Sequence, residues 1–199
     1  MNNKPVSMGI TFILIISGLL GMNQFGSLNV SGTTVSGTVY DGNGGPWTVA
    51  GSPYIVVGTI DIPVGETLTI DPGVLVKFDD WYRISVDGNL SCVGTQATRI
   101  NITSNKASPS ILDWGYFEVF PTGHLELRYT NISYATIAFW IKSSNNNITN
   151  NIFSNNGHDI WTDGSSYNNI TGNIFDDGGL DIEGDQLEHF NTHTIPDDN

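Results

Sequence analysis

The sequence has a single cysteine, Cys92, among its 199 residues. One thiol cannot form an intramolecular disulfide, so a fold built on a disulfide framework is excluded. The surrounding segment, Leu90-Ser-Cys-Val93, predicts that Cys92 is a small apolar side chain of the core rather than a reactive group.

Positive charge is also scarce, because seven Lys and Arg stand against 20 Asp and Glu, for a net charge of −13. Nucleic acid needs a basic surface for its phosphates, so this balance excludes DNA and RNA as partners. It also disfavours binding to anionic membrane surfaces. The acidity indicates either simple solubility or an affinity for cations.

Helical periodicity is missing from residues 143–186, since no apolar residues follow the i, i+3, i+4, i+7 spacing over 11 or more positions. This region instead contains a repeat of 22 residues, in which 143–164 and 165–186 are identical at 13 positions. Single Ile positions between Gly and Asn corners at this period are typical of one rung of a parallel β-helix. A leucine-rich repeat is the competing solenoid, but its Leu framework is absent.

Stacked rungs lie about 4.8 Å apart, so equivalent residues meet along the axis. We therefore expect Phe153 on Phe175 and Ile160 on Ile182 inside the coil. Asn151 should lie near Asn173 at a corner, because Asn tolerates left-handed backbone and its amide can bond the equivalent amide in the next rung.

The chain divides into three parts. Residues 1–25 contain an apolar core of about 12 residues, which fits a secretory signal, cleaved or kept as a membrane anchor. Residues 26–53 are rich in Gly, Ser and Thr and are expected to cover the first rung. Residues 54–199 form about six rungs of three short strands, with an outward loop at 105–114 and an incomplete last rung.

The segment Pro63–Phe78 resembles the opening rung of right-handed parallel β-helix proteins of archaeal and bacterial surfaces. The rungs from Ser143 are similar to the repeats of NosD-like and pectate-lyase-like proteins. The resemblance covers about residues 54–199 and implies a right-handed parallel β-helix of the all-β class. It also implies an archaeal surface protein, export from the cell and frequent contact with carbohydrate. Because the fold hosts many activities, the resemblance does not define one.

Aromatic residues recur beside one strand of each rung. If Ile160 points inward, Trp161 points outward by strand alternation, whereas the side on which Trp140 lies is left open. Indole rings stack on pyranose faces and carboxylates accept hydrogen bonds from hydroxyl groups, so an exposed column would form a sugar platform. The alternative is packing in the core or in loops. The candidate glycan-binding residues are Trp81, Tyr82, Trp114, Tyr116, Trp161, Glu118 and Glu183.

Acidic residues recur at equivalent positions of the repeat. The pairs Asp159/Asp181 and Asp163/Asp185 are candidate metal ligands, because carboxylates about 5 Å apart repel each other or gather a cation such as Ca²⁺. The alternative is that these side chains are solvated or cap turns. The repeat of known calcium-binding β-rolls, Gly-Gly-x-Gly-x-Asp, is absent, which weakens the calcium hypothesis.

The remaining motifs give weaker signals. NosD-like proteins suggest copper maturation, but the four histidines form no evident cluster with Met or Cys.

Six N-x-S/T sequons occur, of which those at Asn147 and Asn169 are explained by the repeat itself. The candidate glycosylation sites are Asn29, Asn89, Asn101 and Asn131.

The sequence thus predicts an exported extracellular or cell-surface module, carbohydrate-contacting or structural and without a catalytic site. The alternative is a polysaccharide lyase or glycoside hydrolase. For a lyase, the best candidate for the catalytic base is Arg83, which lies beside Asp79 and Asp80. For a glycoside hydrolase, Asp176-Asp177 together with Asp159 or Asp181 could provide the acidic residues. No cofactor is implied beyond the calcium hypothesis, and the membrane is expected to be contacted only through the N-terminal segment.

Overall fold

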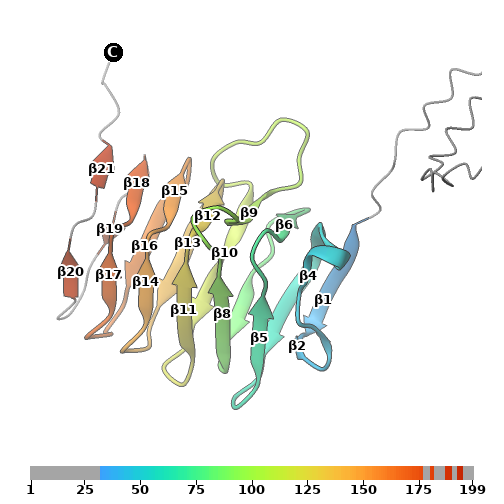
Figure 1. The fold of residues 1–199 in the computed structure, drawn as a ribbon, viewed down its shortest axis with the longest axis horizontal. Coiled ribbons are helices and arrows are strands. Elements are labelled where there is room, and N and C mark those ends of the chain that lie inside the picture. Colours follow the sequence, from blue (N-terminus) through green and yellow to red (C-terminus); the bar gives the residue numbers. More distant parts are fainter. Residues whose placement is uncertain (1–31, 177–179, 182–186, 190–191, 195–199) are drawn as a thin grey trace, which may run out of the picture.

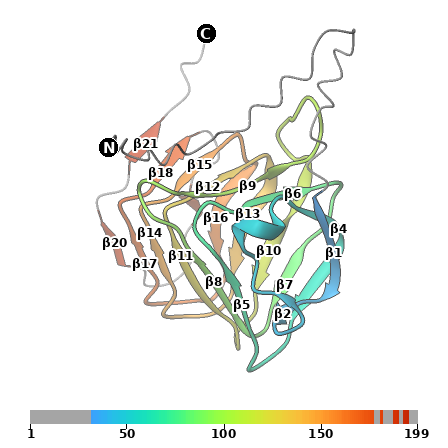
Figure 2. The same ribbon diagram turned by 45° about the vertical axis from the view of Figure 1, so that its right-hand side comes forward.

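The structure is a computed structural model that describes residues 32–176, 180–181, 187–189 and 192–194. Within these ranges it is a coil of short parallel strands with one 3₁₀ turn (Figures 1 and 2). The predicted signal or anchor at 1–25 lies outside the described residues. Among the described residues, no helix has the length and apolarity needed to cross a membrane.

Each rung contributes one strand to each of three faces of the coil. The first face contains β4 (Tyr54–Ile62), β7 (Ile84–Val86), β10 (Trp114–Val119), β13 (Ala135–Ile141), β16 (His158–Thr162) and β19 (Leu180–Asp181). The second face contains β5 (Thr67–Ile70), β8 (Asn89–Val93), β11 (His124–Arg128), β14 (Asn147–Thr149), β17 (Asn169–Thr171) and β20 (Leu187–His189). The third face contains β6 (Leu75–Phe78), β9 (Ile100–Ser104), β12 (Thr130–Ser133), β15 (Ile152–Ser154), β18 (Ile174–Asp176) and β21 (Thr192–Thr194).

The prediction of a parallel β-helix is confirmed, with six three-strand rungs and a further strand, β1 (Thr33–Thr38), on β4. Strands β19, β20 and β21 pair with the preceding rung on all three faces, and the incompleteness of the last rung stays a prediction. Residues 105–113 form the predicted outward loop between β9 and β10 (Figure 1).

The first rung is covered by the described part of the predicted cap. Strands β2 (Tyr40–Asp41) and β3 (Gly44–Gly45) and the 3₁₀ turn η1 (Val49–Gly51) follow β1. Asp41 accepts hydrogen bonds from the backbone N–H and the hydroxyl of Thr69. Trp47 is fully buried, stacks on Tyr54 and donates its indole N–H to Gly44. These contacts satisfy and shield what is otherwise an open strand edge.

The core is a set of apolar columns along the axis. On the first face Ile60, Ile84, Phe117, Phe139 and Ile160 follow one another in register. On the third face the rings of Phe153 and Phe175 stack with centroids 5.2 Å apart, as predicted. On the second face Cys92 lies between Ile70 and Leu127, fully buried, as its sequence context indicates.

One stacking prediction was wrong: Ile160 pairs with Leu180, so Trp161 rather than Asp159 pairs with Asp181. The 22-residue period holds on the other two faces, where Ile148 pairs with Ile170 and Phe153 with Phe175. The connection from β18 to β19 is therefore two residues shorter than the equivalent connection from β15 to β16. A constant period in the sequence does not require a constant register on every face.

The corners are built by Asn–Asn pairs in which the two residues have different tasks. Asn145, Asn150 and Asn155 have positive φ angles of 63°, 58° and 56°, a conformation that Asn tolerates better than most residues. The asparagine that follows each of them is buried, and its amide bonds the neighbouring rungs. These inward residues are Asn146, Asn151 and Asn156, with Asn168 and Asn173 continuing the first two ladders.

Asn151 shows how a ladder works. Its side-chain carbonyl accepts the backbone N–H of Thr130 at 2.9 Å, and its amide nitrogen donates to the carbonyl of Leu127 at 3.0 Å and to Asn173 at 3.0 Å. Backbone groups that have no strand partner at the corner are thereby satisfied inside the coil. Leaving such groups buried and unpaired costs about 1–3 kcal/mol each.

We predict that Asn151→Ala lowers the free energy of unfolding by about 2–4 kcal/mol, because two backbone groups lose their partners in a dry corner. The matched control is Asn147→Ala, whose side chain donates to Glu126 at 2.9 Å and accepts from Asn169 at 2.9 Å on the outer side of the coil, where water can replace it. Urea denaturation followed by circular dichroism measures both. Equal losses for the two variants would contradict this account of the corners.

Candidate functional site

Four aromatic rings form a continuous row on the outside of the first face. Trp81 lies in the turn before β7, Tyr116 on β10, Trp140 on β13 and Trp161 on β16. Consecutive ring centroids are 5.7 Å, 5.9 Å and 5.3 Å apart. The first two contacts are edge-to-face, and the third is a parallel stack. We call these four residues the aromatic strip.

The strip follows from alternation and register. Phe139 and Ile141 point into the core, so Trp140 between them points out. Trp140 pairs directly with Trp161, and Glu118 pairs with Trp140 one rung earlier. In-register stacking thus aligns Trp140 with Trp161, whereas Tyr116 pairs with Ile137 and meets the Trp140 ring edge-to-face from a neighbouring position.

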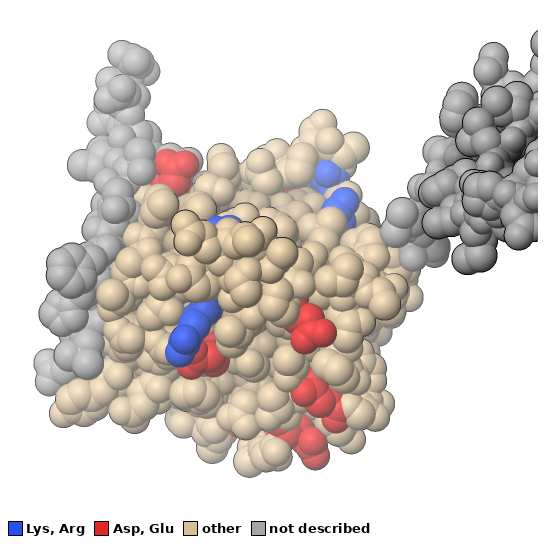
Figure 3. Space-filling model, in the orientation of Figure 1, with Lys and Arg blue, Asp and Glu red and all other residues tan. Residues whose placement is uncertain are grey.

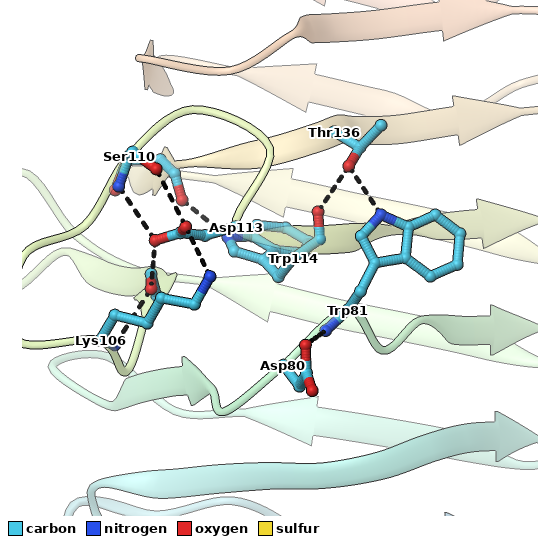
Figure 4. A network of polar contacts seen from close by, with 9 residues as sticks. Asp80, Trp81, Lys106, Ser110, Asp113, Trp114 and Thr136 are labelled. Carbon is cyan, nitrogen blue, oxygen red and sulfur yellow. Dashed lines mark hydrogen bonds and ion pairs between the residues drawn. The ribbon is translucent and has the colours of Figure 1, made fainter.

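Trp81 is the most exposed member of the strip, at 52%. Its indole N–H donates to the Thr136 hydroxyl at 2.9 Å, and that hydroxyl donates to the carbonyl of Trp114 at 2.9 Å (Figure 4). The backbone N–H of Trp81 donates to Asp80 at 2.8 Å. The ring is thus held by its edge while much of its surface faces solvent, which suits a stacking platform.

A buried ion cluster lies beside the strip. Glu118 is only 5% exposed, and its two oxygens contact the ammonium of Lys142 at 2.7 Å and the guanidinium of Arg83 at 3.5 Å. The Lys142 ammonium also lies 3.7 Å from the centre of the Trp140 ring, within the range of a cation–π contact. A hydrogen bond with Tyr116 raises the pKa of Arg83 above its ordinary value, and the nearby carboxylates of Glu118 and Asp61 add to the effect.

The strip contains three of the predicted glycan-contacting residues, Trp81, Tyr116 and Trp161. Trp140 was not among the predicted residues, although the inward positions of Phe139 and Ile141 on either side of it were a signal for its outward position. Lys142 was missed because nothing in the sequence placed it against Glu118 and Trp140. Glu183 lies outside the described residues.

Trp114, predicted to lie on the outer face, is instead fully buried and stacks on Phe78 with centroids 4.2 Å apart. Trp114 and Tyr116 lie on opposite sides of β10 although they are two residues apart, so strict alternation fails at the start of this strand and does not place Trp114. Tyr82 is also displaced from the strip, since it packs partly buried against the core. Glu118 faces the strip with a cation at each of its two oxygens and only 5% of its surface exposed, and its contact with a glycan stays a prediction.

The candidate metal ligands are not brought together where their side chains are described. Asp159 is fully buried and accepts a hydrogen bond from Asn156 at 2.9 Å, whereas Asp163 accepts one from the Trp140 indole at 3.3 Å. Asp181 pairs with Trp161 instead of Asp159, and Asp185 lies outside the described residues. Among the described residues there is no group of three or more His, Cys, Asp or Glu that could hold a metal ion. A calcium site that involves Asp181 and Asp185 stays a prediction.

Most of the candidate glycosylation sites have their amides engaged. The amide nitrogen of Asn131 donates to Asn101 at 2.9 Å, and that of Asn101 approaches the carbonyl of Arg99 at 3.5 Å. Asn89 is exposed and donates to the Thr67 hydroxyl at 3.2 Å. Glycosylation of Asn89 stays a prediction, and Asn29 lies outside the described residues.

The loop of residues 105–113 is fastened next to the strip by Asp113. Its carboxylate accepts hydrogen bonds from the Ser104 hydroxyl at 2.8 Å, from the N–H of Ser110 at 3.0 Å and from the Ser110 hydroxyl at 3.1 Å (Figure 4). Lys106 completes the set with an ion pair of 2.8 Å. Burial alone raises the pKa of the carboxyl, but the contacts with Lys106, Ser110 and Ser104 outweigh it and lower the pKa to about 2.

A family model described as "Periplasmic copper-binding protein (NosD)" matches residues 92–198, which is more than half of the chain. The chain belongs to the NosD family. Searches of curated proteins and of solved structures give no significant match. The family match agrees with the resemblance that the sequence carries, and with the parallel β-helix.

The residues whose side chains are described do not fit the copper in the NosD family's name. Copper sites use imidazole, thiolate and thioether ligands. The Cys92 thiol is enclosed in the core, and burial raises its pKa, so it is unsuited to form a thiolate. His124 on β11 and His158 on β16 belong to different faces of the coil. No step through copper is therefore derived for this chain.

We predict that the 105–113 loop loosens in acid before the coil does. The folded pKa of Asp113 lies below its ordinary value of 3.8, so its stabilisation is complete above about pH 4 and is lost as the pH falls toward 2. Hydrogen–deuterium exchange of the loop amides measures this, and Asp113→Asn should show faster exchange already at pH 7. Loop exchange that does not change between pH 5 and pH 2.5, beyond the intrinsic rate, would contradict the clamp.

Proposed function

We propose that this protein is an exported β-helix module that binds a glycan chain along the aromatic strip and has no catalytic role. The observation that carries the proposal is the strip itself, with four rings from four successive rungs on one outer surface. Soluble proteins bury most large aromatic side chains, so an ordered outer row of them marks an interaction surface.

The chemistry of the strip suits sugars. Aromatic rings provide apolar stacking surfaces, and indole N–H groups and nearby carboxylates provide directional polar contacts. From Trp81 to Trp161 the strip crosses three rung spacings, about 14 Å in all. That length suits several consecutive sugar residues of an extended chain rather than a single monosaccharide.

Export and an envelope location are supported by two features. The apolar segment of residues 8–21 has the length of a secretory signal. The family to which the chain belongs is described as periplasmic. On the side seen in Figure 3, where the strands of the second face lie toward the viewer, charged residues are sparse between large uncharged areas.

We predict that Trp81→Ala and Trp161→Ala each weaken glycan binding about tenfold, because each removes one stacking surface of roughly 1 kcal/mol or more. A glycan array with the intact protein identifies the ligand, and isothermal titration calorimetry with that ligand measures the change. Both side chains lie outside the core, so the melting temperature should change little.

The matched control is Tyr167→Asn. Tyr167 is 62% exposed at a corner away from the strip, and its φ of 58° is one that Asn adopts readily, as Asn145 does at the equivalent corner. Binding that is reduced equally by this control, or that is unaffected by both Trp variants, would exclude the strip as the binding surface.

A further inference from the structure

The charges around the aromatic strip point to one class of glycan. Arg83 and Lys142 lie beside it, and Lys106 lies near enough to Asp80, the residue before Trp81, to interact with its charge. Each of the three cations is held by a carboxylate of the protein. In a chain with seven basic residues, these three are the ones that an acidic ligand at this face would need. Their availability therefore decides which ligands the strip accepts.

Lys142 and Arg83 share the buried carboxylate of Glu118, and Lys142 in addition lies over the Trp140 ring. Arg83 lies farther from Glu118, at 3.5 Å, and its side chain is 43% exposed, so Glu118 offsets its charge without enclosing it. A ligand carboxylate or sulfate could recruit Lys142 only by displacing it from Glu118. That would leave a carboxylate of 5% exposure without its closest partner, which is strongly unfavourable, so Lys142 is unavailable.

Further carboxylates give the surroundings a negative balance. Asp79 and Asp80 precede Trp81 and are exposed, Asp61 acts on Arg83, and Asp163 binds the Trp140 indole. Counting Glu118 and Asp113 as well, the surroundings contain six carboxylates and three cations, a net charge of three negative charges. An anionic polymer that approaches this face is repelled.

We infer that the strip takes a neutral, hydroxyl-rich glycan and rejects uronic, sulfated or phosphorylated ones, and that Glu118 is the residue that sets this preference. The inference rests on the proposed function. Exposed carboxylates such as Asp80 can accept hydrogen bonds from sugar hydroxyls. The charges of the cations that would attract an acidic sugar are offset by the protein's own carboxylates, Glu118 and Asp113.

The test compares neutral polymers, dextran and hydroxyethyl cellulose along with the neutral members of a glycan array, with polygalacturonate and alginate. The wild-type protein should bind a neutral glycan with little change between about 50 mM and 500 mM NaCl, since no ion pair with the ligand is formed. Acidic polymers should bind about tenfold more weakly or not at all.

Glu118→Gln should release Lys142 and Arg83 and remove one negative charge. Binding of polygalacturonate or alginate should then rise about tenfold at low salt and disappear at high salt. The matched control is Glu66→Gln, the same chemical change in the turn between β4 and β5, which should leave the binding of acidic and neutral glycans as in the wild type. If Glu118→Gln fails to fold, the wild-type comparison decides alone.

Two results would overturn the inference while the proposed function stands: a salt-sensitive preference of the wild type for acidic glycans, or a folded Glu118→Gln variant without gain for them. If the wild type binds no glycan of either kind, the proposed function fails and the inference fails with it. Circular dichroism and the melting temperature establish that each variant is folded.

Discussion

In-register parallel stacking is the constraint on which the whole structure depends. Each rung buries its apolar side chains only against the rungs on either side, as the column Ile60, Ile84, Phe117 and Phe139 shows. The corners interrupt the strand ladders, and inward amides such as Asn151 supply the hydrogen bonds missing there. Among the described residues no buried side-chain nitrogen or oxygen is left without a partner.

The same constraint produces the candidate site. Stacking that aligns Phe139 with Ile160 inside the coil also aligns Trp140 with Trp161 outside it. Stacking therefore provides the line through Trp140 and Trp161, and Tyr116 and Trp81 extend the row from neighbouring positions through ring contacts. What the local sequence adds is the control of charge, through Glu118 and its two cations, and the fastened loop that Asp113 holds beside the strip.

The sequence predicted the fold well because the residues that recur in its 22-residue repeat are typical of the corners and the core of a parallel β-helix. Asn–Asn corners and the pairs Ile148/Ile170 and Phe153/Phe175 left one arrangement. The site was predicted less well. Trp114 faces inward because strict alternation fails between Trp114 and Tyr116, and the Asp159/Asp181 pair failed because one connection is two residues shorter. Both depend on local backbone geometry, and neither Glu118–Lys142 nor Trp81–Thr136 is visible in a pattern of residue types.

The most direct measurement of the central claim is disulfide trapping across adjacent rungs. Thr149 and Thr171 are register partners on the outer surface, so their Cα atoms lie about 4.8 Å apart, within the range that a disulfide spans. The Thr149→Cys/Thr171→Cys variant should oxidise completely under mild conditions, as judged by mass spectrometry. The diagonal pair Asn147→Cys/Thr171→Cys, about 7–8 Å apart, should not. Equal oxidation of the two variants, or none in the first, would contradict in-register stacking.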